Sequence, residues 1–316
     1  MSTWNALVDE SNAVEGAEKD AWINDKLSEC VRAVSEAREG RNVLVYFSAF
    51  LQKPAVPATH TMMMPEDING FMAAFHGMDW DKGLSVVMHT PGGATMAVQS
   101  LVDYTRSKFR DVELLVPAYS MSAGTMFGLA CERIYLGRQS QLGPIDPQLT
   151  INGRQQSARS IVEQFERAHD EILGNSKKKQ SPNPAAAAVW APLLGSLGPS
   201  LLQTAQDQLD FSESMVARWL ASYMFANERD AAKRGKKVAK YFNDASSHKS
   251  HDKRISYDEA RKQGVVAVRL EDDQGLQEAV LTLYHLLTII VGQTSVTKLI
   301  SANSGVVWAK NWTGTT

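Results

Sequence analysis

Two short motifs near the middle of the chain carry the residue types that acyl-transfer chemistry needs. The sequence TPGG at 90–93 ends one apolar segment, and YSMSAG at 119–124 ends the next. A glycine pair allows positive φ and a close approach of the backbone, so that its N–H groups can point into a cleft. A serine at a strand-to-helix junction lies beside free first-turn N–H groups, which stabilise negative charge. Together the motifs predict a nucleophilic hydroxyl and backbone donors for a tetrahedral oxyanion.

Ser122 is the predicted nucleophile, and Ser120, two residues earlier, is its rival. We favour Ser122 because it opens the following helix and precedes two small residues. The oxyanion donors would be the N–H groups of Ala123 and of Gly92 or Gly93, with Gly93 favoured. Each motif alone also fits a plain turn or a helix cap, since both are common in loops.

Three short apolar strands are predicted to position these motifs, at 84–89, 112–118 and 133–136. The first two each run through a turn motif into a helix. The third ends in a loop, 137–148, that contains two prolines and Asp146. Strands that alternate with helices in this way indicate an α/β fold.

Three motifs in this order resemble one protein family. HTPGG at 89–93, MSAGT at 121–125 and LGPIDPQ at 142–148 are similar to the serine dehydrogenase proteinase family of the Clp protease/crotonase superfamily, which is related to Clp protease and signal peptide peptidase A. The similarity is dense over 84–148 and weaker near 247–268. It implies a Clp/crotonase-like α/β spiral of strand–strand–helix units with a helical insertion. It also implies a serine endopeptidase with a Ser-His-Asp triad and a backbone oxyanion hole.

The resemblance also implies the two other triad members. In this family the chain order is serine, aspartate, histidine, so Asp146 would be the orienting acid and the base would follow it. The segment SHDKRI at 250–255 is similar to the family's histidine loop and points to His251, although Asp252 stands where the family pattern has glycine. His248 is the alternative base.

Other basic residues were weighed for the same role. His89 precedes the glycine turn, and we expect it to pack beside the cleft. His169 and His285 lie in helices with apolar periodicity and are expected in the core or an interface, whereas His60 is expected to face solvent. The lysines at 177–179 read as a solvated loop, with a Ser-Lys dyad as the alternative.

Composition limits the class of protein. The chain has 316 residues, 44% of them hydrophobic, and a formal net charge of -2, which suits soluble domains with a sizeable core. The near-neutral charge predicts neither nucleic acid nor an anionic membrane as a partner. Two cysteines are no disulfide framework, and we expect Cys131 to be a buried thiol. The polar, acidic first twenty residues do not read as a signal peptide, so the expected location is cytoplasmic.

We expect four parts: a helical segment at 1–40, a Clp/crotonase-like core at 41–155, a helical insertion at 156–245, and the end of the core at 246–316. The stretch 294–302 is expected to extend or follow a long apolar helix.

The expected partners are a peptide or protein substrate and further copies of the chain. The resemblance implies a homo-oligomer, for which the N-terminal helix and the apolar helix at 276–291 are candidate contact surfaces, although both fit the core of the chain equally well. The chain has no G-x-x-x-x-G-K-[ST] nucleotide loop and no dinucleotide fingerprint, so we expect no cofactor. Any ATP-driven unfolding would need a separate regulatory or unfoldase partner.

Three alternatives stay open. An α/β-hydrolase fits because SMSAG approximates G-x-S-x-G, but the glycine turn lies only one strand–helix unit upstream. A crotonase-like acyl-CoA enzyme would use the same two donors for a thioester enolate. A non-catalytic binding or scaffold protein would keep the fold without using the triad.

Overall fold

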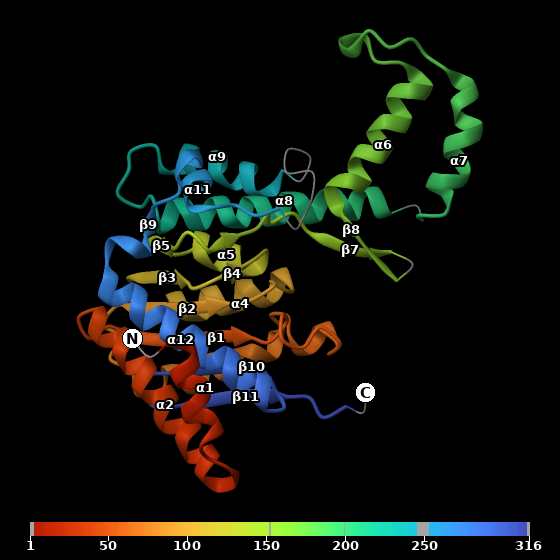
Figure 1. Ribbon diagram of the computed structural model, residues 1–316. Coiled ribbons are helices and arrows are strands. Elements are labelled where there is room, and N and C mark those ends of the chain that lie inside the picture. Colours follow the sequence, from red (N-terminus) through yellow and green to blue (C-terminus); the bar gives the residue numbers. More distant parts are fainter. Residues whose placement is uncertain (1–2, 152, 199, 245–252, 315–316) are drawn as a thin grey trace.

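A seven-stranded sheet forms the centre of the molecule, in the order β11-β10-β1-β2-β3-β5-β9 (Figure 1). The computed structural model describes residues 3–151, 153–198, 200–244 and 253–314. The strands of the sheet are β1 (Asn42–Ser48), β2 (Leu84–His89), β3 (Val112–Val116), β5 (Arg133–Leu136), β9 (Ala267–Arg269), β10 (Val296–Ala302) and β11 (Val307–Asn311).

Five of these strands, from β1 to β9, are parallel, and β10 and β11 extend the sheet antiparallel beside β1. Every residue of β1, β2 and β3 is buried. Full burial is typical of parallel strands that helices cover on both faces. Successive side chains of β1 alternate between the two faces, so that Val43 and Val45 pack on one side and Leu44 and Tyr46 on the other.

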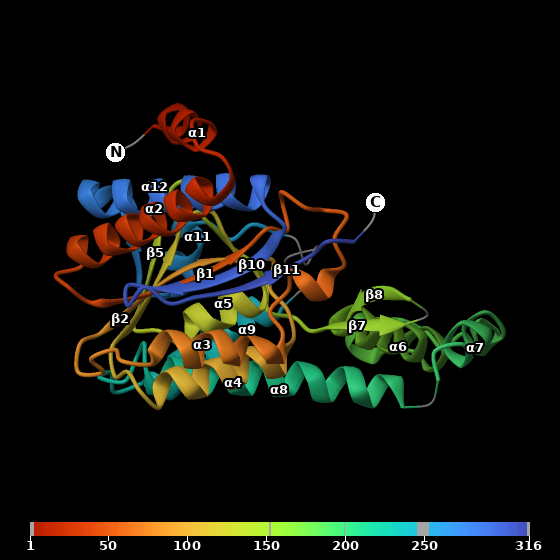
Figure 2. The same cartoon turned by 90° about the horizontal axis from the view of Figure 1, so that it is seen from below.

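Helices cover both faces of the sheet and make three layers (Figure 2). The described helices are α1 (Trp4–Asn12), α2 (Gly16–Ala37), α3 (Ile68–Phe75), α4 (Thr95–Arg106), α5 (Ala123–Leu129), α6 (Ala158–Leu173), α7 (Ala187–Gly195), α8 (Leu201–Ser222), α9 (Ala231–Asn243), α11 (Tyr257–Gln263) and α12 (Gln274–Gln293). Helices α1, α2 and α12 lie over one face, and α3, α4, α5, α8 and α9 over the other. The architecture is therefore mixed α/β, as the sequence predicts.

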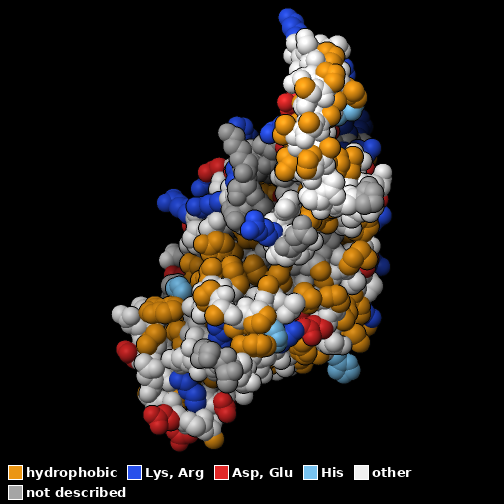
Figure 3. Space-filling view, turned by 90° about the vertical axis from the view of Figure 1, so that its right-hand side faces the viewer, with side chains coloured by type: hydrophobic (Ala, Val, Ile, Leu, Met, Phe, Trp, Pro, Cys, Tyr) orange, Lys and Arg blue, Asp and Glu red, His pale blue; other side chains and the backbone are white. Residues whose placement is uncertain are grey.

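An arm of the chain, described at 148–151, 153–198 and 200, projects from the body (Figure 1). It contains the hairpin of β7 (Gln148–Ile151) and β8 (Arg154–Ser157), followed by α6 and α7. A small apolar cluster joins α6 to the first half of α8, whereas the second half of α8 packs in the main core. No residue of α7 is buried. Figure 3 shows hydrophobic side chains along this arm.

Two elements that the sequence left open are specified by the structure. The stretch 294–302 contains the strand β10 and does not continue the preceding helix. Val296, Thr297 and Ile300 are β-branched, which favours a strand, and residues 298–302 of this strand pair with β1 from the distant N-terminal part of the chain. The N-terminal segment is two helices, α1 and α2, because the backbone takes a positive φ of 55° at Gly16.

The two helices proposed as contact surfaces pack on each other. Both α2 and α12 contribute buried residues to the same apolar cluster, on the face of the sheet that α1, α2 and α12 cover. Helix α12 has 20 residues and is long and apolar enough to cross a membrane, but eight of its residues are buried in this cluster. Its apolar character is thus explained by core packing.

Candidate functional site

Ser122 lies at the N-cap of α5 with an unusual backbone. Its φ of 48° and ψ of −112° fall outside both the right-handed and the left-handed helical regions. Such a conformation is strained by about 1–3 kcal/mol for a residue with a Cβ, and it persists only where the surroundings enforce it. The strained turn directs the half-buried Ser122 toward a cavity, which it lines.

Ser120 lies in a different environment. It belongs to the two-residue strand β4 (Tyr119–Ser120), and its side chain is fully buried. Its hydroxyl has no hydrogen-bond partner among the described residues and does not line the cavity. The structure thus separates the two serines by access: a substrate in the cavity reaches Ser122 and not Ser120.

The glycine turn lies directly against the serine turn. A Cβ on Gly92, whose φ is 102°, would come 2.7 Å from Ser122 Cβ and 3.1 Å from Ala123 N. Thr90 forms a backbone bridge to Ser120, which ties the end of β2 to β4. The glycine is needed here both for its φ and for the close approach.

The two glycine N–H groups have different partners. Gly92 N–H donates to Thr90 Oγ1 at 3.1 Å, a local side-chain turn that a threonine two residues earlier can form. The N–H groups of Gly93 and Ala123 have no acceptor among the described hydrogen bonds. Of the predicted donors, Gly93 and Ala123 are therefore available to a ligand, and Gly92 is not. Thr90 is a residue that the sequence analysis missed, although its position before the turn could have indicated it.

Asp146 is buried in the loop after the serine helix, with 1% of its surface exposed. Gln148 Nε2 donates to Asp146 Oδ2 at 2.9 Å. Both residues line the same cavity as Ser122. The loop is tied to α5 by Thr125, whose Oγ1 donates to the Ser120 carbonyl at 2.7 Å and accepts the Gly143 N–H at 2.9 Å. Gln148 and Thr125 were not singled out from the sequence.

The cavity between these elements has a volume of about 610 Å³. Ser122, Gly93 and Asp146 all line it. The rest of its wall is largely apolar, with amide and hydroxyl groups and no basic side chain among the described residues. The apolar lining consists of Phe50, Ala58, Met62, Met64, Pro91, Ala94, Met96, Met126, Ile145 and Pro147. The site therefore suits an uncharged, apolar group beside the serine.

None of the five described histidines lines this cavity. His89 is buried among aromatic rings, its Nδ1 accepts the Tyr119 N–H at 3.4 Å, and burial lowers its pKa to about 3. The His169 side chain is 67% exposed on α6, so it lies outside the core of this chain, and the expected interface position stays a prediction. His60 is partly buried with its ring against Trp312, and so does not simply face solvent. His285 is partly buried against Trp4.

His248 and His251, the two candidate bases, lie outside the described residues. The residues that flank this segment are bonded to the loop that carries Asp146. Ile145 N–H donates to the Phe242 carbonyl at 2.8 Å, and Leu142 and Ile255 exchange backbone hydrogen bonds of 2.9 and 3.0 Å. The lysines at 177–179 belong to the arm, where Lys178 pairs with Asp170 at 2.7 Å.

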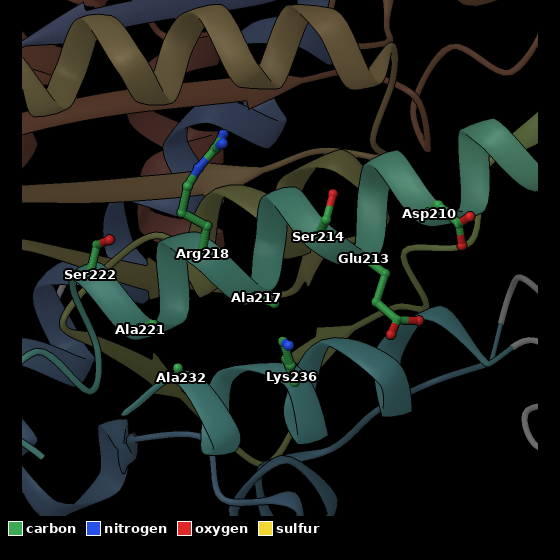
Figure 4. A pocket seen from close by; sticks show the side chains of 9 residues that line it. All are labelled: Asp210, Glu213, Ser214, Ala217, Arg218, Ala221, Ser222, Ala232 and Lys236. Carbon is green, nitrogen blue, oxygen red and sulfur yellow. The ribbon is translucent and has the colours of Figure 1, made fainter. Parts of the chain in front are cut away.

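A second hollow, of about 640 Å³, lies between α8 and α9 (Figure 4). Alanines 217, 221 and 232 line its middle, and Asp210, Glu213, Arg218 and Lys236 surround them. The helices are close here because Gly235 has no side chain: a Cβ on Gly235 would lie 2.5 Å from the Ala217 carbonyl oxygen. Figure 4 shows Ser214 pointing away from Lys236, so the hollow does not assemble a nucleophile and a base.

Known proteins are similar to parts of this chain. The chain is 34% identical over 101 residues to one uncharacterized protein of Methanocaldococcus jannaschii, a match that covers 32% of this chain and 34% of that protein. It is 24% identical over 144 residues to a second, over 45% of this chain and 48% of the other. The chain thus matches between about a third and a half of the length of these curated relatives. A family model matches residues 19–177, half of the chain, and that stretch holds Ser122, both glycines and Asp146. By this match the chain belongs to the ClpP-like SDH-type serine proteinase family.

Proposed function

We propose that the protein is an ATP-independent serine endopeptidase that cleaves peptides or proteins at Ser122. The observation that carries this proposal is the strained Ser122 on a cavity wall, beside the unbonded N–H groups of Gly93 and Ala123. A carbonyl oxygen between those donors would be stabilised as it becomes an oxyanion. The membership of a serine proteinase family supports the same reaction.

In this proposal Asp146 orients the base and His251 takes the proton from Ser122, with His248 as the alternative. Asp146 is buried and lines the same cavity as Ser122, which supports its role. The bonds from Phe242 and Ile255 to the Asp146 loop support a base from the segment between them. Leaving-group protonation by the same histidine would complete acylation, and water would then hydrolyse the acyl-enzyme.

The apolar wall of the cavity favours substrates with an uncharged, apolar side chain next to the cleaved bond. Leucine or methionine peptides should therefore be cleaved faster than matched lysine or glutamate peptides. Kinetics on a panel that differs at this one position measures the preference as a ratio of kcat/KM.

Labelling with a fluorophosphonate tests the proposal. A working serine hydrolase is modified at Ser122, which mass spectrometry of the labelled peptide detects, while Ser122→Ala should lose both label and cleavage, by a factor on the order of 10⁴ or more. Ser120→Ala is the matched control and should keep most activity, since Ser120 does not line the cavity. Cleavage that survives in Ser122→Ala contradicts the proposal. No label on the wild-type protein would favour a crotonase-like enzyme or a binding protein.

Alanine variants at Asp146, His251 and His248, assayed beside Ser122→Ala, test the rest of the triad. Loss of activity in His251→Ala with activity kept in His248→Ala is expected. The reverse pattern assigns the base to His248, and activity that survives loss of both histidines directs the search to a lysine.

A further inference from the structure

A buried ion pair lies next to the chain segment that holds the glycine turn. Lys298 of β10 and Asp67, the last residue of the short helix η2 (Pro65–Asp67), have no exposed surface. Lys298 Nζ lies 2.7 Å from Asp67 Oδ1, and the buried Tyr46 hydroxyl donates to Asp67 Oδ2 at 2.7 Å. Met64 N–H donates to the same Oδ2 at 3.0 Å. The carboxylate thus connects two strands of the sheet to the backbone at Met64.

The backbone at residues 63 and 64 in turn holds the glycine turn at 90–93. Met63 N–H donates to the Gly92 carbonyl at 2.8 Å, and Ala94 N–H donates to the Met63 carbonyl at 3.0 Å. A Cβ on Gly93 would lie 2.2 Å from the Met63 carbonyl oxygen, so the Gly93 backbone lies directly on Met63. Any shift of Met63 therefore moves the Gly93 N–H group.

We propose that Asp67, held by Lys298 and Tyr46, is a positioning residue for the oxyanion hole, acting through Met64 and Met63 on the Gly93 N–H. The inference rests on the proposed function, because it assigns that N–H a part in catalysis. Asp67 does not line the cavity and touches no substrate.

The chemistry of the cluster fits this role better than a role in stability alone. A buried ion pair is often no more stabilising than an apolar pair of similar volume. A carboxylate, in contrast, can accept hydrogen bonds from three directions at once, and here Lys298, Tyr46 and Met64 supply the donors. Three fixed bonds hold the Met64 backbone in one place relative to the sheet. A pre-positioned donor needs that rigidity, since its effect depends on distance and direction.

A matched pair of single variants tests the inference on the full chain. Tyr46→Phe removes one hydroxyl bond to a buried carboxylate near the site. Ser85→Ala also removes one hydroxyl bond to a buried carboxylate, but near the start of β2: Ser85 Oγ donates to the buried Glu113 at 2.7 Å. Loss of a whole oxyanion donor lowers kcat about 10²–10³-fold, so a displaced donor in Tyr46→Phe should lower kcat about tenfold. Its KM and the pH dependence of kcat should stay unchanged, and Ser85→Ala should keep its kcat.

Two double variants replace the ion pair without leaving an unpaired charge. Asp67→Asn with Lys298→Met keeps an oxygen that can accept the Met64 N–H, whereas Asp67→Leu with Lys298→Met removes it. The first should keep most of kcat, and the second should lose about 10²-fold at unchanged KM. If a double variant does not fold, the Tyr46→Phe result decides.

Equal kcat in Tyr46→Phe and Ser85→Ala overturns the positioning role, as does equal kcat in the two double variants. Failure of the proposed function looks different, because then the wild-type protein would show no cleavage, or Ser122→Ala would cleave as fast as the wild-type protein.

Discussion

At the scale of single residues, the site depends on backbone conformations that ordinary side chains avoid. Three described non-glycine residues have positive φ: Glu39, Lys179 and Ser122. Lys179 is in the left-handed helical region, where ψ is 34°, but Ser122 has a ψ of −112°. Ser122 keeps this strained conformation at the wall of the cavity that Gly93 also lines, and such strain persists only where the surroundings enforce it.

The strain at Ser122 predicts an effect on stability that is separate from catalysis. The free energy of unfolding of Ser122→Gly should be about 1 kcal/mol larger than that of Ser122→Ala, because glycine adopts this φ and ψ without a Cβ clash. Urea unfolding of both inactive variants measures the difference. At Ser120, in the strand β4, the order should reverse, with Ser120→Gly less stable than Ser120→Ala. The same order at both positions would remove the argument for strain.

His89 predicts how stability depends on pH. Burial lowers its pKa from the ordinary 6.5 to about 3. Between these values the unfolded chain binds a proton that the folded chain does not, so stability is full above pH 6.5 and is lost as the pH falls toward 3. From pH 7 to pH 5 this residue alone should lower the free energy of unfolding by about 2 kcal/mol. His89→Phe, which suits the aromatic surroundings, should reduce that loss in chemical unfolding at the two pH values.

The measurement compares His89→Phe with the wild-type protein at the two pH values. A pH dependence that is unchanged in His89→Phe would contradict the prediction.

At the scale of elements, α5 and the Asp146 loop are held together by one buried hydroxyl. Thr125 bonds the Ser120 carbonyl on one side and the Gly143 N–H on the other. Gly143 itself leaves no room for a Cβ, which would lie 2.7 Å from the Met121 side chain. The serine turn and the loop are therefore bonded and packed against each other.

Thr125→Val keeps the shape of this residue and removes both bonds. The buried Gly143 N–H would lose its acceptor, which should lower the free energy of unfolding by about 1–3 kcal/mol. A shift of the loop relative to Ser122 should also lower kcat/KM about tenfold or more. Steady-state kinetics and urea unfolding measure the two effects.

Thr105→Val is the matched control for this variant. Thr105 is equally buried in α4, but its hydroxyl bonds only the Leu101 carbonyl one turn earlier, at 2.7 Å. Thr105→Val should keep the wild-type kcat/KM. The same kinetic loss in both variants would mean that Thr125 has no special part in the site.

At the scale of the whole molecule, the two surfaces first expected between subunits are used within one chain. Helices α2 and α12 bury their apolar faces against the sheet and each other. Exposed apolar side chains occur on both the body and the arm, and two of the more exposed ones, Val189 and Leu193 of α7, are 67% and 57% exposed. We propose that the protein assembles with further copies of itself and that α7 takes part in the contact.

Light scattering tests this assembly. The mass at micromolar concentration should be a multiple of 34.8 kDa, because closed symmetric assemblies are the default for such contacts. Leu193→Glu should reduce the mass, since a charge would enter an apolar contact. Met72→Glu, which places the same charge at a residue of α3 that is 52% exposed, should not. A wild-type mass of 34.8 kDa would contradict the proposal.

The local sequence determined the elements and turns around the site. The strands predicted at 84–89 and 133–136 have these bounds in the structure, because their apolar runs end in glycine or proline turns. The serine turn was predicted at the start of α5 for the same kind of local reason. The triad partners of Ser122 stay predictions, since His251 lies outside the described residues.

Only the tertiary structure decided which of the predicted groups are available and what holds them. Local patterns carry no information on which N–H group is already hydrogen-bonded. The hydrogen bond from Gly92 N–H to Thr90 Oγ1 is what distinguishes Gly92 from Gly93 as an oxyanion donor. The strand β10 was missed because its pairing with β1 joins residues far apart in the chain. The Lys298–Asp67 pair joins residues 231 positions apart. Such contacts depend on how the sheet brings distant segments together, and hydrophobic periodicity within one segment does not contain that arrangement.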